Sequence, residues 1–239
     1  MSDRSVSIVI PAHNEEKWVQ RCVASIRAAA QPPSLQIIVA DNASTDRTAE
    51  TARAAGATLV VHEPRKGTNF ARQRGWKEAH GDIVAFIDAD EEMPPHWFTA
   101  VLEAFARHPD AVAVTGPCRC DDLPPWKRWQ IRLWNTSARV SHMFTGASLM
   151  GGNFAVRRTA LEKAGGFDTS LVFFGDDVDT ARRLRKHGKI LYLPSLCIRT
   201  SGRRWAAQGF VHTASAYGLN YLSAFLLGRP VIRRSRDIR

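Results

Sequence analysis

The sequence predicts an α/β fold in which helices flank a mostly parallel sheet. The first 90 residues alternate four times between a short β-branched run and a segment with helical periodicity. Connections of that length join parallel strands through right-handed crossovers. Three of the runs end in a polar residue or a turn, at 11–14, 41–42 and 88–90. Because ligands bind beyond the carboxyl ends of such strands, this edge of the sheet is the expected site.

Each element of the first half follows from a local pattern. Asn14 is expected to cap the first helix, whose apolar residues from Trp18 to Ile26 recur at helical spacing. A cluster at 44–46 is expected to cap the second helix, which Gly56 ends. The expected strands are 5–10, 35–40, 58–61 and 83–87, and the expected helices are 14–26, 47–55 and 70–79.

After Asp90 the pattern is less regular. Segment 126–134 alternates Trp with Arg, which suits either a helix that packs ordinary aromatics or an element that binds a membrane interface or an acceptor. The chain divides into a catalytic unit, 1–205 (with halves 1–90 and 91–205), and a C-terminal amphipathic helix with a basic tail, 206–239. The expected strands are 111–116, 151–156 and 189–193, and the expected helices are 94–107, 158–164, 176–187 and 205–227.

Composition limits the partners. The net charge of +10 over 239 residues favours anions such as nucleotides and phospholipid head groups. Four scattered cysteines suit a reducing compartment and give no zinc pattern.

With no signal-peptide pattern and no apolar run of spanning length, we expect a cytoplasmic chain, peripheral on the inner face of the plasma membrane. The aromatic, Leu-rich stretch before Arg229 fits an interfacial helix on anionic lipid, or a helix docked on the catalytic unit.

The strand at 83–87 runs directly into two carboxylates, Asp88 and Asp90. Two acids at this spacing can direct oxygens at one divalent cation. Mg²⁺ or Mn²⁺ held by one or two carboxylates plus substrate phosphates is the matching chemistry. A solvated strand end without a ligand is the alternative interpretation.

Other strand ends can supply the remaining parts of a nucleotide site. His13 can stack on a base, and Asp41 can accept a hydrogen bond from its ring N–H, while Lys66 and Arg72 add positive charge near phosphates. An acidic pocket of this kind needs a cation that arrives with the diphosphate. Capping of the following helix is the alternative role for Asp41.

A second acid pair, Asp176 and Asp177, begins a predicted helix beside Phe173 and Phe174. Adjacent buried carboxylates repel each other, and burial raises the pKa of one of them. Such a group can act as a general base toward an attacking hydroxyl. The alternative is helix capping with dipole compensation.

These motifs together resemble the family 2 glycosyltransferases, over Ser5 to about Trp205. The resemblance implies a GT-A fold with a Rossmann-like, mostly parallel sheet, and inverting transfer from a nucleoside-diphosphate sugar. The matching motifs occur in family order at 7–15, 41–48, 66–67 with 71–72, 81–90, 151–154, 165–168 and 176–177 with 183–184.

The resemblance implies a role for each matching residue. Asp88 and Asp90 would hold Mn²⁺ or Mg²⁺, Asp41 would read the base, and Asp177 would be the catalytic base beside Asp176. UDP or GDP would carry the sugar, and the acceptor would be a glycan or lipid-linked hydroxyl. The nucleotide-sugar would contact Pro11, Ala12, His13, Asn14, Glu15, Asp41, Lys66, Arg72, Asp88 and Ala89, and the acceptor or diphosphate would contact Gly152, Asn153, Arg203, Arg204 and Trp205.

Three departures from the family pattern matter. His13 stands where Tyr is common, and Asp176 replaces the usual Glu, which leaves open which acid is the base. Arg203-Arg204-Trp205 resembles a motif of processive members but lacks its Gln, so a non-processive enzyme is expected. The rival interpretations are a sugar-phosphate nucleotidyltransferase, which would want a Gly-rich basic loop after the first strand, and a non-catalytic binding module. Carboxylates in the crevice argue against a nucleic-acid partner.

Overall fold

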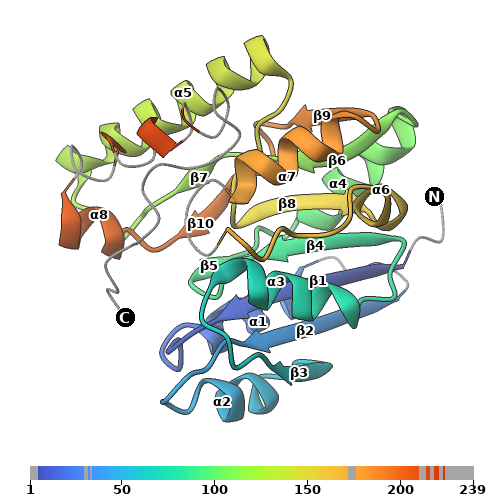
Figure 1. Cartoon of the computed structure of the whole chain (residues 1–239). Helices are drawn as coiled ribbons and strands as arrows, with labels where there is room; N and C mark the ends of the chain where they lie inside the picture. The colour runs from blue at the N-terminus through green and yellow to red at the C-terminus, as the bar shows by residue number, and fades with distance from the viewer. Residues whose placement is uncertain are drawn as a thin grey trace.

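A seven-stranded sheet forms the centre of the molecule, and a three-stranded sheet lies beside it (Figure 1). The computed structural model describes residues 5–29, 32, 34–171, 176–209, 214–215, 218–220 and 223. The large sheet has the order β3 (Leu59–His62), β2 (Leu35–Asp41), β1 (Val6–Ala12), β4 (Ile83–Ile87), β8 (Asn153–Arg157), β6 (Ala111–Thr115), β9 (Lys189–Tyr192). The small sheet has the order β5 (Glu91–Glu92), β10 (Ile198–Thr200), β7 (Cys118–Arg119).

The large sheet is mostly parallel, as predicted. β1 pairs in parallel with β2 and β4, β2 with β3, and β6 with β9, whereas β8 runs antiparallel between β4 and β6. All five residues of β4 are buried, as a strand covered on both faces requires. The parallel strands therefore bring the polar ends of β1, β2 and β4 to one edge.

Helices cover both faces of the sheet, and each face has its own apolar core. Ile8, Val23 and Trp97 belong to one core, which α1 and α4 close; Val9 and Phe86 belong to the other. The helices are α1 (Val19–Ala28), α2 (Thr48–Ala54), α3 (Thr68–Lys77), α4 (Trp97–Arg107), α5 (Arg128–Thr145), α6 (Arg158–Lys163), α7 (Asp176–Arg185) and α8 (Arg203–Gln208), with a 3₁₀ turn at Pro125–Lys127.

A glycine sets the position of α3 on the sheet. A Cβ atom at Gly75 would come within 2.4 Å of Val9 Cγ1, so a larger residue would push the helix away from β1. The close approach keeps α3 on β1, and Arg72, in the middle of α3, reaches Asp88 after β4.

Asn14 does not cap α1, because that helix begins at Val19 and has no side-chain cap. Asn14 instead takes a left-handed conformation (φ 52°), and its Oδ1 accepts a hydrogen bond from Thr45 N at 2.8 Å. Asn tolerates this conformation better than most residues. The bond fastens the loop after β1 to the loop after β2, which shapes the sheet edge. Asp46 stabilises the start of α2, because its Oδ1 accepts a hydrogen bond from Thr48 N at 3.0 Å.

The small sheet is not predicted by the sequence. Its strands contain two or three residues each, which is too short for any periodic pattern. β10 pairs antiparallel with β5, directly after the Asp88–Asp90 turn. Because β10 pairs with β5, the residues that follow β10, from Ser201 onward, lie at the polar edge of the large sheet.

The prediction for the C-terminal region is wrong where the structure describes it. α8 ends at Gln208, and Gly209 has φ 77°, so no continuous helix runs from 205 to 227. Most of the proposed amphipathic helix and the whole basic tail, within 206–239, lie outside the described residues. Across the described ranges, no helix combines the length and the apolar character needed to cross a bilayer.

Candidate active site

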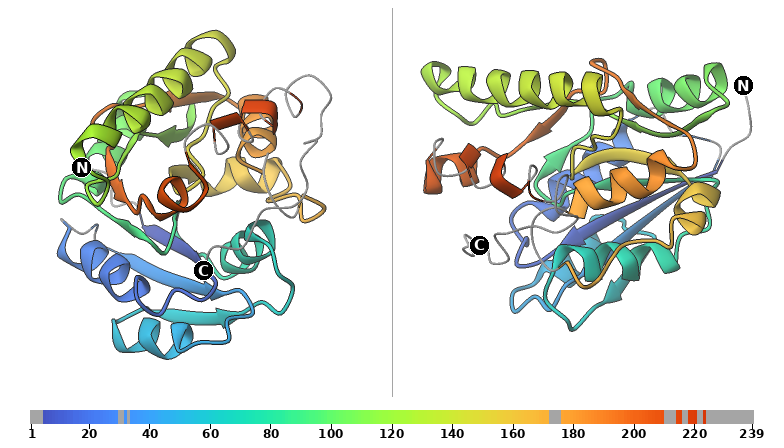
Figure 2. Two further views of the ribbon diagram at one scale, coloured as in Figure 1. Left: turned by 90° about the vertical axis from the view of Figure 1, so that its left-hand side faces the viewer. Right: turned by 45° about the horizontal axis from the view of Figure 1, so that its top comes forward.

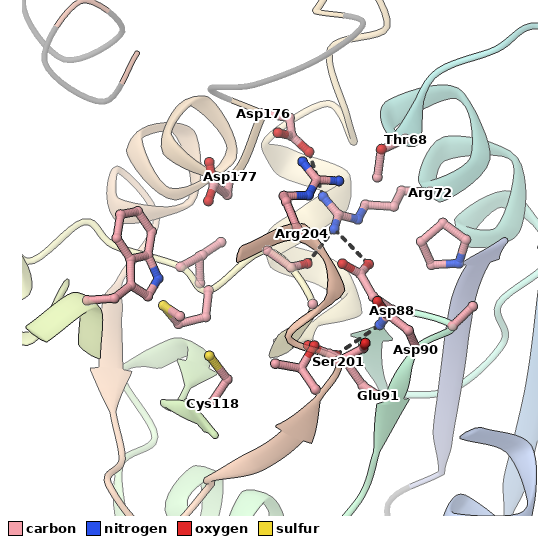
Figure 3. Close-up of a pocket in the computed structure, with 18 of the residues that line it drawn as sticks. Thr68, Arg72, Asp88, Asp90, Glu91, Cys118, Asp176, Asp177, Ser201 and Arg204 are labelled. Atoms are coloured by element: carbon pink, nitrogen blue, oxygen red, sulfur yellow. Dashed lines mark hydrogen bonds and ion pairs between the residues drawn. The ribbon is translucent and has the colours of Figure 1, made fainter. Parts of the chain in front are cut away.

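A cavity of about 470 Å³ lies at the carboxyl ends of β1 and β4. The loops after these strands form one wall, and residues of α3, α5, α7 and α8 form the others. Figure 3 shows that both predicted acid pairs face this space. The cavity therefore combines residues from the two halves of the chain.

Asp88 and Asp90 lie in the turn that follows β4, and each pairs with an arginine. Asp88 Oδ1 is 3.2 Å from Arg72 Nη2, and Asp90 Oδ2 is 3.0 Å from Arg203 Nη2. The Asp88 side chain is 40% exposed and lines the cavity. These are hard oxygen donors of the kind that Mg²⁺ and Mn²⁺ prefer.

Glu91 holds this turn in place, a role that the sequence did not predict. Its Oε2 accepts a hydrogen bond from Asp88 N at 3.0 Å. Burial, and then the charges of Asp88 and Asp90, hold the pKa of Glu91 well above its ordinary value. A Cβ atom at Gly152 would lie 2.6 Å from the Glu91 carboxylate oxygens, so a larger residue there would displace this carboxylate. Glu91 and Gly152 thus join the β4 turn to the turn before β8.

Arg72 connects the two acid pairs (Figure 3). Its side chain is 3% exposed, and Nη1 lies 2.6 Å from Asp176 Oδ2 while Nη2 pairs with Asp88. Nη2 also donates to the carbonyl of Gly151. Burial alone would lower the pKa of Arg72, but Asp88 and Asp176 raise it, so the guanidinium stays charged.

Asp177 is in a different environment from its neighbour. Burial, and then the charge of Asp176, raise the pKa of Asp177 to about 7. Asp176 is the member of the pair that binds Arg72. Asp177 is therefore the member whose proton is labile near neutral pH, which suits a general base.

At the base end of the expected nucleotide site, His13 lines the cavity but Asp41 does not. His13 lines the cavity, and its Nδ1 lies 2.7 Å from the carbonyl of Asn42. Asn42 also lines the cavity and was missed; its Oδ1 accepts from Gly67 N at 2.8 Å, which holds the 66–67 turn in place. Asp41 is outside the cavity lining, with Oδ2 3.2 Å from His62 Nδ1.

Arg203 brings α8 onto the first half of the chain. Its Nη2 bonds Glu15 Oε1 at 2.5 Å as well as Asp90, and its guanidinium lies 5.5 Å from the Trp18 ring centre. Trp205 packs edge-on against Trp134 of α5, with ring centres 5.8 Å apart. The cavity wall is thus held by contacts between residues far apart in sequence.

The structure brings most of the predicted site residues together. Asn14 and Lys66 do not line the cavity, and neither does Asn153. Asn153 donates through Nδ2 to the carbonyls of Pro117 and Leu196, and its Oδ1 accepts from Trp97 Nε1, so it ties β8 to its neighbours. The predicted residues that line the cavity are Pro11, Ala12, His13, Glu15, Arg72, Asp88, Ala89, Asp90, Gly152, Asp176, Asp177, Arg203, Arg204 and Trp205.

Comparison with known proteins identifies the family. Residues 7–165 match the family model described as "Glycosyl transferase family 2". The chain belongs to glycosyltransferase family 2. This membership confirms the resemblance seen in the sequence and places the chain among transferases.

Curated relatives cover part of the chain. An undecaprenyl-phosphate 4-deoxy-4-formamido-L-arabinose transferase of Pseudomonas paraeruginosa is 31% identical over 57% of this chain and 42% of its own length. A pre-mycofactocin glycosyltransferase of Mycobacterium tuberculosis is 29% identical over 90% of this chain and 47% of its own length. The chain spans less than half the length of both relatives.

Solved structures share the fold. A mannosyltransferase from Pyrobaculum calidifontis, in complex with GDP-Man and Mn²⁺, superposes with a TM-score of 0.75 at 22% identity, over 99% of this chain and 66% of that one. A glucosyl-3-phosphoglycerate synthase from Mycobacterium tuberculosis, in complex with Mg²⁺ and UDP, gives 0.68 at 22% identity, over 95% of this chain and 80% of that one. The predicted GT-A fold is confirmed.

Proposed function

We propose that this glycosyltransferase moves a sugar from a UDP- or GDP-sugar to a hydroxyl or lipid-linked acceptor, with inversion and with a divalent metal. One observation carries the proposal: a buried arginine, Arg72, joins two acid pairs across one cavity. The pair at Asp88 and Asp90 suits a cation, and Asp177 suits proton transfer. Metal-assisted transfer with a general base uses both in one place.

The donor end of the cavity fits a metal–diphosphate unit. Among the described residues that line it, the carboxylates of Glu15, Asp88, Asp90, Glu91, Asp176 and Asp177 face the guanidiniums of Arg72, Arg203 and Arg204. This acidic excess is compatible with an anionic diphosphate only when a cation accompanies it. In the described part of the chain no three His, Cys, Asp or Glu side chains form a metal cluster, so phosphate and water would complete the coordination of an ion at Asp88 and Asp90.

Relatives of known structure support this assignment. The mannosyltransferase was solved with GDP-Man and Mn²⁺, and the glucosyl-3-phosphoglycerate synthase with UDP and Mg²⁺. The ion, when bound, would neutralise charge on the departing diphosphate. Arg203 and Arg204, which line the same cavity, would add further positive charge for the phosphates.

His13 and Asn42 are the residues we assign to the base end, with Pro11 and Ala12 beside them. Asp41 ends the same strand, but one of its carboxylate oxygens contacts His62. Each carboxylate oxygen can accept a further hydrogen bond, so Asp41 keeps acceptor capacity for a base N–H.

The acceptor end is where Asp177 removes a proton. The acceptor oxygen forms a bond to the anomeric carbon as the bond from that carbon to the diphosphate oxygen breaks, and the hydroxyl proton passes to Asp177. The neighbouring Asp176 carboxylate accepts a hydrogen bond from Arg72 instead. Gly151 lies beside this point, because a Cβ atom there would be 3.8 Å from Asp177 Oδ2.

A donor screen tests the proposal. Thermal melting of the protein is measured with UDP and GDP, with and without Mn²⁺, and then release of the nucleotide from the corresponding sugars is assayed. A ligand that binds the folded state raises the melting temperature, so a shift that needs Mn²⁺ is expected for one nucleotide. Equal shifts in excess EDTA would contradict the role of Asp88 and Asp90.

A further inference from the structure

The outward side of α5 exposes an unusual amount of apolar surface. In the part of the chain that the structure describes, seven large apolar side chains are exposed, and six of them lie between Trp126 and Phe144, with exposures of 45% to 86%. Single exposed apolar residues are ordinary on a protein surface, but a contiguous set marks an interaction site. The six are Trp126, Trp129, Leu133, Val140, Met143 and Phe144.

These residues form one stripe. Trp129, Leu133, Val140 and Phe144 are separated by four, seven and four residues, which places them on one side of a helix. The stripe runs from Trp129 to Phe144 and extends over about 22 Å of the helix. In both views of Figure 2, and in Figure 1, α5 lies along the outer edge of the molecule.

A basic stripe runs beside the apolar one. Arg128, Arg132 and Arg139 repeat the same four- and seven-residue spacing, one position earlier, and all three are exposed. Residues 126–145 contain four Lys or Arg and no Asp or Glu. A surface with apolar, Trp-rich and purely basic parts is complementary to lipid tails below anionic head groups.

We propose that the outward face of α5 docks on an anionic phospholipid bilayer, lying in the interface rather than crossing it. The charge pattern selects this occupant, because an acid-free basic stripe beside exposed tryptophans matches anionic head groups over acyl chains. Trp134, Ser137 and Ser141, on the next side of the same helix, line the cavity. Docking would therefore hold the active-site cavity beside the bilayer, where a lipid-linked acceptor would lie. The docking itself needs neither donor nor metal.

Vesicle sedimentation of the full chain tests the proposal without any assay of transfer. We expect binding to vesicles of phosphatidylcholine mixed with phosphatidylglycerol, weaker binding to pure phosphatidylcholine, and weaker binding to either at high salt. The double variant Leu133→Ser/Phe144→Ser should bind on the order of tenfold more weakly or worse. Arg132→Glu/Arg139→Glu should lose binding to the mixed vesicles by about tenfold or more.

A matched control separates the α5 face from the general positive charge. Arg53→Glu/Lys77→Glu makes the same charge change at exposed positions on α2 and α3, far from α5 (Figure 1). This variant should bind mixed vesicles nearly as the wild type does. Equal losses in the two charge variants would overturn the proposal, because binding would then depend on net charge alone.

Tryptophan fluorescence locates the contact. Trp126 and Trp129 should move into a less polar environment on vesicles, so the emission should shift to shorter wavelength. In Trp126→Phe/Trp129→Phe the shift should disappear while sedimentation persists. A shift that survives this change places the contact elsewhere, for example in the C-terminal tail, and would overturn the proposal. So would a dimer that Leu133→Ser/Phe144→Ser dissociates while vesicles leave the wild type unbound.

Discussion

The two acid pairs of this site have similar sequences and different arginine partners. Asp88 and Asp90 are in a turn that lines the cavity, and each is matched to an arginine. Asp176 and Asp177 begin a helix, and only Asp176 has the arginine, so burial and repulsion act mainly on Asp177. The difference shows that placement of a carboxylate decides its chemistry: one pair can hold a cation, and the other can hold and release a proton.

The largest effect that would separate the pairs is on catalysis. We expect Asp177→Asn to lower the transfer rate by about 10²–10⁴-fold, because the amide cannot accept the acceptor proton. Binding of the nucleoside diphosphate with Mn²⁺, measured by calorimetry, should change little, since Asp88 and Asp90 are intact. The control is Asp110→Asn, the same chemical change at an exposed residue that pairs with Lys189. Wild-type turnover by Asp177→Asn would remove the base assignment.

The next effect is on stability, and it tests the residue that joins the pairs. Arg72→Met removes a buried guanidinium and leaves Asp88 and Asp176 without their partner. Breaking a buried ion pair in this way costs about 3–5 kcal/mol of unfolding free energy. Urea unfolding measures the loss, with Arg74→Met as the control because its pair with Glu78 lies on the surface of α3. If both variants lost the same small amount, Arg72 would not be the central connection.

A smaller effect concerns the pH dependence of stability. Between its ordinary value of 3.8 and about 7, Asp177 stays protonated in the folded chain but not in the unfolded chain. The folded state then binds more protons, so this group lowers stability as pH rises through that window. Asp177→Asn removes the effect. Its unfolding free energy, relative to that of the wild type, should therefore rise from about pH 5 to about pH 8. A constant difference across this range would mean that Asp177 ionises normally.

The sequence predicts the parts of this site that depend on short segments. The buried run at 83–87 ending in Asp88 and Asp90, and the acid pair at the start of α7, are visible as local patterns. What it misses depends on contacts between distant residues. Arg203 meets Glu15 across 188 positions, and the strands of the small sheet are too short to leave a periodic signal.

Two polar residues show that contacts between distant residues determine the role of a side chain. Asn14 and Asn153 occur within the family motifs, yet one joins two loops and the other ties β8 to its neighbours. The exposed side of α5 is likewise a result of packing. The sequence shows its Trp and Arg residues, but only the fold shows which of them remain uncovered.

The pH dependence of a single turnover tests the central claim most directly. The full chain is loaded with metal and its sugar donor, mixed with acceptor, and the transfer rate is measured from about pH 5 to about pH 8.5. If Asp177 must lose its proton before it can accept one, the rate should rise about tenfold per pH unit up to about pH 7 and then level off. A rate that stays flat down to about pH 5 would contradict the account, because the base would then have the pKa of an ordinary exposed carboxylate.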